Sequence, residues 1–379
     1  MHSKLPTVGT TIFTVMSKMA QDCGAINLSQ GFPDFDCPAR LRELVAEHLN
    51  NRKNQYPPMA GIPELREQIA RKVKILYGYD ADPENNITVT SGATEALFNA
   101  IQATVTRNHE VIVFDPAYDS YVPAIELAGA RAVHIPLNLS DYSVDWDRAR
   151  AAINDKTRLI IINSPHNPCG SVFSFQDLEQ LASIIRDREI YILADEVYEH
   201  MVYDGVKHCS VLSHPELQKK SFAVFSFGKT YHATGWKVAY CVAPGELTEE
   251  FRKVHQFVTF TTSSFVQYAL ADFMQECPEH ATGLPDFYQN KRDRFCALIE
   301  NSKFNFQPSR GTYFQLADYS NISQLSDMEF VTWLTREKGV AAIPLTPFYE
   351  NPPGTKIIRF CFCKDDSTLE QAANILCNL

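Results

Sequence analysis

One lysine of this chain has the surroundings of a nucleophilic amine. Lys229 follows the apolar run Phe222–Phe225, which is typical of a buried strand, so we expect it at a strand end that opens into a pocket. Lys237 lies eight residues further on, with small residues between the two that let the chain turn. Burial and a neighbouring cation both lower the pKa of a lysine amine. These features suit an amine that forms an imine with an aldehyde cofactor, although most lysines are solvated surface groups.

Two segments after predicted strands suit a planar, phosphorylated ligand. Thr90–Thr94 joins a strand to a helix, where Ser91 is a candidate cap and Gly92 lets the backbone approach closely. The free amides of such a first turn bind phosphate well, although an ordinary capped helix start has the same pattern. Tyr118 follows the next strand, and its ring either stacks on a flat cofactor or is simply buried in the core.

Three more predicted strands end in, or contain, polar residues. Asn167 lies in a turn fixed by two prolines and a glycine, and it either faces the pocket or only forms the turn. Asp195 directly follows a buried apolar run, so its carboxylate needs a partner such as a protonated ring nitrogen, or it caps a helix. Tyr198 lies on the same face if a helix begins there. Arg359 interrupts the apolar run Ile357–Phe362 and either binds a ligand carboxylate or forms an internal salt bridge.

The composition is that of a soluble globular protein. Of the 379 residues, 45% are hydrophobic and 21% charged, and the net charge of -10 argues against a nucleic-acid surface. No apolar run is long enough to span a bilayer, and the N-terminal residues lack the apolar core of a secretory signal. The ten cysteines are scattered without zinc-site spacing, which predicts free thiols in a reducing cytoplasm and no bound metal.

The candidate residues need a sheet whose strand ends meet at one edge. Residues 85–245 alternate short apolar runs with helical patterns. This alternation predicts a doubly wound α/β domain with a mixed, mostly parallel seven-stranded sheet between helices. The predicted strands are Ile87–Thr90, Val111–Phe114, Ala132–Ile135, Leu159–Ile162, Tyr191–Ala194, Ala223–Phe225 and Val238–Val242.

The C-terminal residues predict a smaller α+β lobe. The helical patterns lie around Phe287–Glu300 and Asp327–Lys338, and the β-like segments are Thr312–Leu316 and Lys356–Cys361. The first 45 residues contain no strand that fits the large sheet, so we expect them to pack on this lobe. The predicted division is a large domain of residues 46–275 and a small domain of residues 1–45 and 276–379.

In their order and spacing, these segments resemble the class I/II aminotransferases of fold type I, which depend on pyridoxal 5'-phosphate (PLP). The resemblance covers nearly the whole chain. Within that family the chain most resembles the bacterial methionine aminotransferases, relatives of kynurenine aminotransferase and glutamine transaminase K. The segments that carry this closer resemblance are Asn27–Phe35, Asn54–Gly61, Ser226–Lys237 and Gly311–Phe314.

The resemblance implies a role for each candidate residue. Lys229 would bind the cofactor aldehyde and later carry the proton, and Asp195 would keep the pyridine nitrogen protonated. Asn167 and Tyr198 would hydrogen-bond the phenolic oxygen, and Tyr118 would stack on the ring. The cofactor phosphate would be bound by Gly92, Ala93, Thr94, Ser226, Lys237 and Tyr56 of the partner subunit. The substrate carboxylate would be bound by Arg359, Gly31 and Asn167.

The implied activity moves an amino group from methionine, and also from glutamine and aromatic amino acids, to a 2-oxo acid by a ping-pong mechanism. The protein would be an obligate homodimer with shared active sites. Apolar residues beside the motifs, among them Phe13, Phe32 and Tyr313, suit long unbranched or aromatic side chains. Arg310 would favour an acidic substrate if it faced the pocket, but we expect it to be solvated in a turn.

Other functions stay open on the sequence. β-Elimination from cysteine S-conjugates starts from the same Cα carbanion, and an aminotransferase of aromatic or aspartate specificity would share the site. A non-catalytic PLP-binding sensor is disfavoured, because no basic helix-turn-helix is found. A nicotinamide or nucleotide enzyme is disfavoured as well, because the chain has neither a G-x-G-x-x-G turn nor a Walker loop.

Overall fold

The large sheet has seven strands in the order β2-β8-β7-β6-β5-β3-β4. The computed structural model describes residues 2–379. Strands β4, β3, β5, β6 and β7 run parallel, and β8 is antiparallel to both of its neighbours. The strands are β2 (Ile87–Thr90), β3 (Glu110–Asp115), β4 (Arg131–Pro136), β5 (Thr157–Asn163), β6 (Tyr191–Asp195), β7 (Ser221–Ser226) and β8 (Ala239–Val242). The predicted mostly parallel sheet is confirmed.

Two layers of helices bury this sheet. Because successive side chains of a strand point to opposite faces, Val111 and Val113 pack in one apolar cluster and Ile112 packs in another. The first cluster includes α4 (Ala93–Thr104), α5 (Tyr121–Leu127) and α9 (Gly245–Val258). The second includes α2 (Ala39–Asn50), α3 (Pro63–Tyr77), α6 (Trp146–Ala151), α7 (Phe175–Ile185) and α10 (Ser264–Glu276). Among the helices of residues 2–379, none combines the length and apolar composition needed to cross a membrane.

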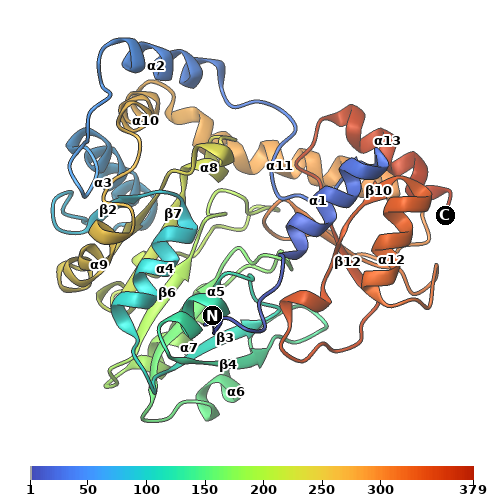
Figure 1. Cartoon of the computed structure of the whole chain (residues 1–379), viewed down its shortest axis with the longest axis horizontal. Helices are drawn as coiled ribbons and strands as arrows, with labels where there is room; N and C mark the ends of the chain where they lie inside the picture. The colour runs from blue at the N-terminus through green and yellow to red at the C-terminus, as the bar shows by residue number, and fades with distance from the viewer. Residues whose placement is uncertain (1) are drawn as a thin grey trace.

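A second lobe, at the right of Figure 1, is built from the C-terminal residues. Its antiparallel sheet has the order β11-β12-β9. Its elements are α11 (Pro278–Ile299), β9 (Phe314–Asp318), α12 (Asp327–Trp333), the π-helical turn η4 (Leu334–Lys338), β10 (Val340–Ala341), β11 (Ile343–Pro344), β12 (Ile357–Cys361) and α13 (Asp366–Cys377). Helix α11 begins before the predicted Phe287, because Pro278 at its first position and Glu279 in its first turn favour a helix start.

The N-terminal residues divide between the two lobes. Strand β1 (Ile26–Asn27) pairs in parallel with β10, and α1 (Ile12–Cys23) lies beside it on the small lobe (Figure 1). Helix α2 packs instead on α10 of the large domain, where Arg40 pairs with Glu276. The predicted boundary at residue 46 falls inside α2, so a boundary ahead of this helix fits the packing better. The domain division stays a prediction, and Met1 lies outside the described residues.

Candidate active site

The carboxyl ends of β5, β6 and β7 open onto a cavity of about 340 Å³, to which the small lobe contributes Arg359 of β12. This edge is where ligands of doubly wound sheets bind. One predicted site residue, Tyr56, does not line the cavity. The other twelve do: Gly31, Gly92, Ala93, Thr94, Tyr118, Asn167, Asp195, Tyr198, Ser226, Lys229, Lys237 and Arg359.

Lys229 lies in α8 (Phe227–Thr230), a one-turn helix that directly follows β7. Its Nζ donates hydrogen bonds to the Tyr313 hydroxyl at 2.8 Å and to the Gly31 carbonyl at 3.1 Å. Burial lowers the pKa of this amine to about 8, because desolvation disfavours the ammonium form. A substantial fraction of the amine is therefore neutral near physiological pH, as a nucleophile or a general base requires.

Asp195 is the last residue of β6 and is buried. Burial raises the pKa of its carboxyl to about 6, although the Tyr121 hydroxyl donates a hydrogen bond to it at 2.7 Å. A buried carboxylate with a raised pKa gains from a cationic partner. The helix considered after Asp195 is absent, because hydrogen bonds between residues three apart close a turn there. Tyr198 of this turn still faces the cavity, with its ring centre 5.5 Å from the Nζ of Lys229.

The start of α4 forms a cradle around Lys237. Gly92 is the N-cap residue with φ 83, and a Cβ at this position would lie 3.0 Å from the Cε and 3.1 Å from the Nζ of Lys237. The expectation that Ser91 caps the helix is wrong, because no side chain caps α4 and the Ser91 amide instead donates to the carboxylate of Glu95. The first-turn amides therefore stay available beside a lysine, as in phosphate sites at helix N-termini.

Arg359 is fully buried, yet it forms no ion pair with any acidic side chain of residues 2–379. Its Nη1 donates to the Asn167 side-chain oxygen at 2.7 Å, and its Nη2 donates to the Ser29 carbonyl at 3.1 Å. Its Nε has no hydrogen-bond partner within the described chain, and the guanidinium lies 3.8 Å from the ring centre of Phe314. A buried guanidinium without an acid favours an anionic ligand, so the internal salt bridge considered for Arg359 is wrong.

These observations fit the separate chemical groups of PLP and of its substrate. The unpaired guanidinium suits a substrate carboxylate, the cradle at Gly92 suits a phosphate, and the buried carboxylate of Asp195 suits a protonated ring nitrogen. Lys229 supplies the amine that an aldehyde requires. Within residues 2–379, no group of three or more His, Cys, Asp or Glu side chains is placed to hold a metal ion.

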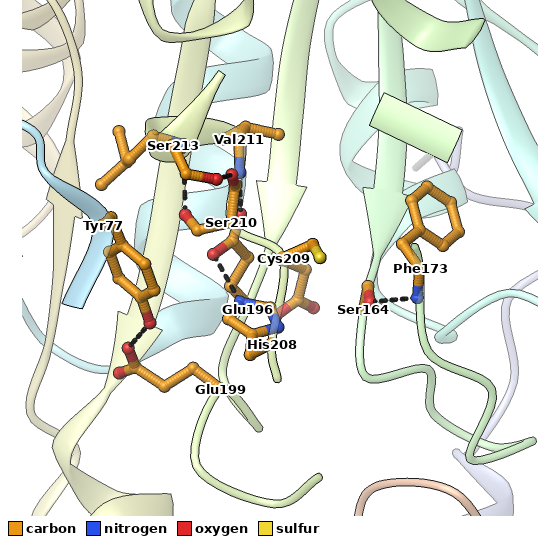
Figure 2. A network of polar contacts seen from close by, with 12 residues as sticks. Tyr77, Ser164, Phe173, Glu196, Glu199, His208, Cys209, Ser210, Val211 and Ser213 are labelled. Carbon is orange, nitrogen blue, oxygen red and sulfur yellow. Dashed lines mark hydrogen bonds and ion pairs between the residues drawn. The ribbon is translucent and has the colours of Figure 1, made fainter. Parts of the chain in front are cut away.

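The turn after β6 is anchored on its other side by a buried polar network, part of which Figure 2 shows. Glu199 accepts a hydrogen bond from the Tyr77 hydroxyl of α3. Glu196 lies 2.8 Å from the Nε2 of His208. The two glutamates therefore tie the turn to the layer that packs behind it, while Asp195 at the strand end lines the cavity.

Two residues with expected or suspected roles lie outside the cavity. Tyr56 is 86% exposed, and its ring packs edge-on against Phe260 with 5.8 Å between ring centres. Arg310 is exposed and lines a separate surface recess that includes Asp141. The solvated position expected for Arg310 matches this placement.

Three residues that complete the site were not expected to act there. Tyr313 contacts Lys229, although the sequence suggested only an apolar wall. Tyr121 contacts Asp195, and Glu95 holds the amide of Ser91. Only Glu95 carries a sequence signal, because an acidic residue in the first turn after a predicted N-cap often binds the preceding backbone amide.

The fold and the cavity together define an aminotransferase of the PLP-dependent type. The family model for aminotransferase class I and II matches residues 24–376. The chain therefore belongs to the class I and II aminotransferase family, and it is a transaminase. Enzymes of this family depend on PLP and act on amino acids and 2-oxo acids. The family predicted from the sequence is confirmed.

Individual relatives narrow the comparison. The chain is 52% identical to methionine aminotransferase from Escherichia coli over 99% of this chain and 97% of that protein. The crystal structure of a methionine aminotransferase from Escherichia coli superposes with a TM-score of 0.98 at 51% identity, covering 100% of this chain and 99% of the other. The chain is also 33% identical to human kynurenine–oxoglutarate transaminase 3, over 98% of this chain and 89% of that protein.

Proposed function

We propose that this chain binds PLP and transfers the amino group of methionine to a 2-oxo acid. The observation that carries the proposal is the placement of Lys229, a buried amine with a pKa of about 8, in one cavity with Arg359, a buried cation without an acid. When bound, PLP supplies an aldehyde and an electron sink for charge that develops at the substrate Cα.

Each side of the cavity is proposed to contact a different part of the cofactor. Asp195 holds the ring nitrogen in its protonated form, since burial raises the pKa of its carboxyl and a cation beside it would stabilise the carboxylate. Tyr118 lies against the ring, and Asn167 and Tyr198 donate to the phenolic oxygen. The proposed phosphate contacts are the backbone of Gly92, Ala93 and Thr94 with the side chains of Ser226 and Lys237.

The proposed chemistry of the chain rests on two basic side chains, Arg359 and Lys229. Arg359 binds the substrate α-carboxylate with its planar fork, helped by the Asn167 amide and the backbone at Gly31. Neutral Lys229 would then take the Cα proton on its Nζ and hold it there for return to the bound ligand. Because amino acids and 2-oxo acids both carry an α-carboxylate, Arg359 serves both half-reactions.

Methionine as the donor is supported by the cavity wall as well as by the relatives. Apolar Phe13 and Phe32 line the cavity beside Gln30. Among the described residues that line it, the cations are Lys229, Lys237 and Arg359, and each already has a proposed role. No further cation is therefore left there for the side-chain carboxylate of aspartate, whereas an apolar thioether side chain needs none.

An absorbance spectrum before and after methionine tests this function. We expect a band near the visible edge that shifts to shorter wavelength when methionine is added to the PLP-loaded protein. Lys229→Ala should still bind PLP but lose at least the roughly 10²–10⁴-fold that a positioned base contributes. Glutamine, phenylalanine and aspartate serve as comparison donors. A band that methionine leaves unchanged, with release of oxo acid from another donor, would refute methionine.

We also propose a homodimer in which Tyr56 of the partner subunit reaches the phosphate. The exposure of Tyr56 and its absence from its own cavity support this arrangement. Exposed apolar residues close in sequence to Phe260, among them Phe257 at 87% exposure, also support contact with a second copy. A cytoplasmic location stays a proposal, supported by ten cysteines that are all free thiols.

A further inference from the structure

The hydroxyl of Tyr313 contacts the amine proposed to act in catalysis. Tyr313 precedes β9 in the small lobe, and its side chain is fully buried. Its Oη lies 2.8 Å from the Nζ of Lys229 and also forms a hydrogen bond with the Gly31 carbonyl. The Nζ of Lys229 lies 3.1 Å from the same carbonyl. The three groups therefore form a closed triangle that joins both lobes at one amine.

The positions of the protons in this triangle follow from the acceptors. A carbonyl oxygen only accepts, so the single hydroxyl proton of Tyr313 must lie between its Oη and the Gly31 oxygen. If the Tyr313 hydroxyl donated to Lys229 instead, the Tyr313 and Gly31 oxygens would face each other with no proton between them. The Oη of Tyr313 is thus an acceptor towards Lys229. Burial raises the pKa of Tyr313 well above its ordinary value, which keeps the phenol neutral and prevents it from acting as an acid.

This arrangement fixes the direction of the lysine lone pair. A neutral amine has two N–H bonds, and here Tyr313 and Gly31 supply one acceptor for each. The lone pair is the position that remains, and the cavity is the side that remains open to it. An amine held in this way is prepared to take a proton from a bound substrate without first breaking a hydrogen bond.

We infer that Tyr313 is a positioning residue that orients the released Lys229 amine, as an obligate hydrogen-bond acceptor, for proton abstraction. The inference rests on the proposed role of Lys229. Its chemistry requires no proton from Tyr313: Lys229 alone takes and releases the proton that leaves Cα, and the phenol keeps its own proton, which it donates in the hydrogen bond to the Gly31 carbonyl.

The test is Tyr313→Phe, which keeps the ring and removes only the acceptor. We expect the saturating rate of the methionine half-reaction to fall about tenfold, the effect of one lost hydrogen bond, with a change in KM of less than about threefold. An acceptor stabilises the ammonium form, so its loss should also move the acid limb of the pH–rate profile to lower pH. A purely structural defect lowers the rate without that displacement.

A second readout does not depend on substrate or turnover. In the cofactor-free full-length chain, Lys229 is modified by an amine reagent at a series of pH values, and peptide mass spectrometry measures the extent of modification. The pH dependence of this modification should shift to lower pH in Tyr313→Phe. If methionine proves not to be a donor, this shift still tests Tyr313. Should Tyr313→Phe fail to fold, site-specific 3-fluorotyrosine at position 313 has nearly the same shape, a weaker acceptor and the same expected direction.

Tyr288→Phe is the matched control. Tyr288 is equally buried and lies 5.8 Å from Tyr313 between ring centres, but its hydroxyl contacts the Sγ of Cys363 and not Lys229. We expect neither the acid limb nor the Lys229 reactivity to move in this variant. An unchanged or raised midpoint in Tyr313→Phe, or an equal shift in Tyr288→Phe, would overturn the inference.

Discussion

Asp195 carries a buried charge that costs stability in the cofactor-free chain. Burial raises its carboxyl pKa from 3.8 to about 6, so the folded chain binds this proton more tightly than the unfolded chain does. The contribution of this group to the free energy of unfolding is therefore largest below pH 4. It decreases by about 3 kcal/mol as the pH rises through 6. Asp195→Asn removes that loss and should stabilise the cofactor-free chain by about 1–3 kcal/mol at pH 7, with little effect at pH 4.

The same substitution should abolish most transamination, because a neutral amide does not hold a ring nitrogen protonated. Urea unfolding of the cofactor-free chain at the two pH values measures the first effect, and the methionine half-reaction measures the second. Asp286→Asn, at an exposed position of α11, is the control and should change neither. A similar loss of stability at both pH values would contradict the buried-charge argument.

At the scale of elements, a charge pair between α4 and α9 supports the cradle. Glu95 accepts from the Nδ1 of His255 at 2.6 Å and from the Ser91 amide, and the Nε2 of His255 donates to the Met59 carbonyl at 3.0 Å. Both ring nitrogens of His255 therefore face oxygen atoms, one of a carboxylate and one of a backbone carbonyl. Burial acts to raise the pKa of Glu95, but the hydrogen bond and charge of His255, with the Ser91 amide, lower it overall.

Removing one partner of this pair should be costly. His255→Leu leaves the buried carboxylate of Glu95 unpaired, so we expect a loss of about 3–5 kcal/mol in the free energy of unfolding. Cofactor affinity should fall as well, since Ser91 precedes the cradle. The double variant Glu95→Gln/His255→Leu removes the stranded charge and keeps an oxygen for the Ser91 amide, so it should regain much of the stability. Chemical denaturation measures the cycle, and simple additivity would contradict the coupling.

The elements also explain which parts of the site were predictable. Asn167, Asp195 and Lys229 lie at or after the ends of parallel strands of one sheet, and the carboxyl ends of such strands meet at one edge, so their convergence follows from the order of elements. The contact between Tyr313 and Lys229 depends instead on how the small lobe packs on the large one, which no local pattern encodes. The predicted start of β9 at Thr312 was two residues early, because Thr312 has a φ of 62 and cannot continue a strand.

For the whole molecule, the cavity lies where both lobes contribute residues. The large domain supplies Asp195 and Lys229, and the small lobe supplies Arg359 and Phe314. Gly31, between β1 and α2, lines the same cavity, and its carbonyl accepts from side chains of both lobes. Any movement of one lobe against the other therefore changes the surroundings of the amine and the guanidinium together.

The exposure of Tyr56 has a consequence for mixtures of variants. If Tyr56 serves the neighbouring copy, the Tyr56 and Lys229 of one polypeptide belong to different catalytic centres. Two separately inactive proteins, Tyr56→Ala and Lys229→Ala, should then complement each other after subunit exchange. Random exchange puts half of the chains in hybrid dimers, each with one centre free of both lesions, so about a quarter of the wild-type activity should return. Activity that stays absent after verified exchange would place Tyr56 and Lys229 in the same centre.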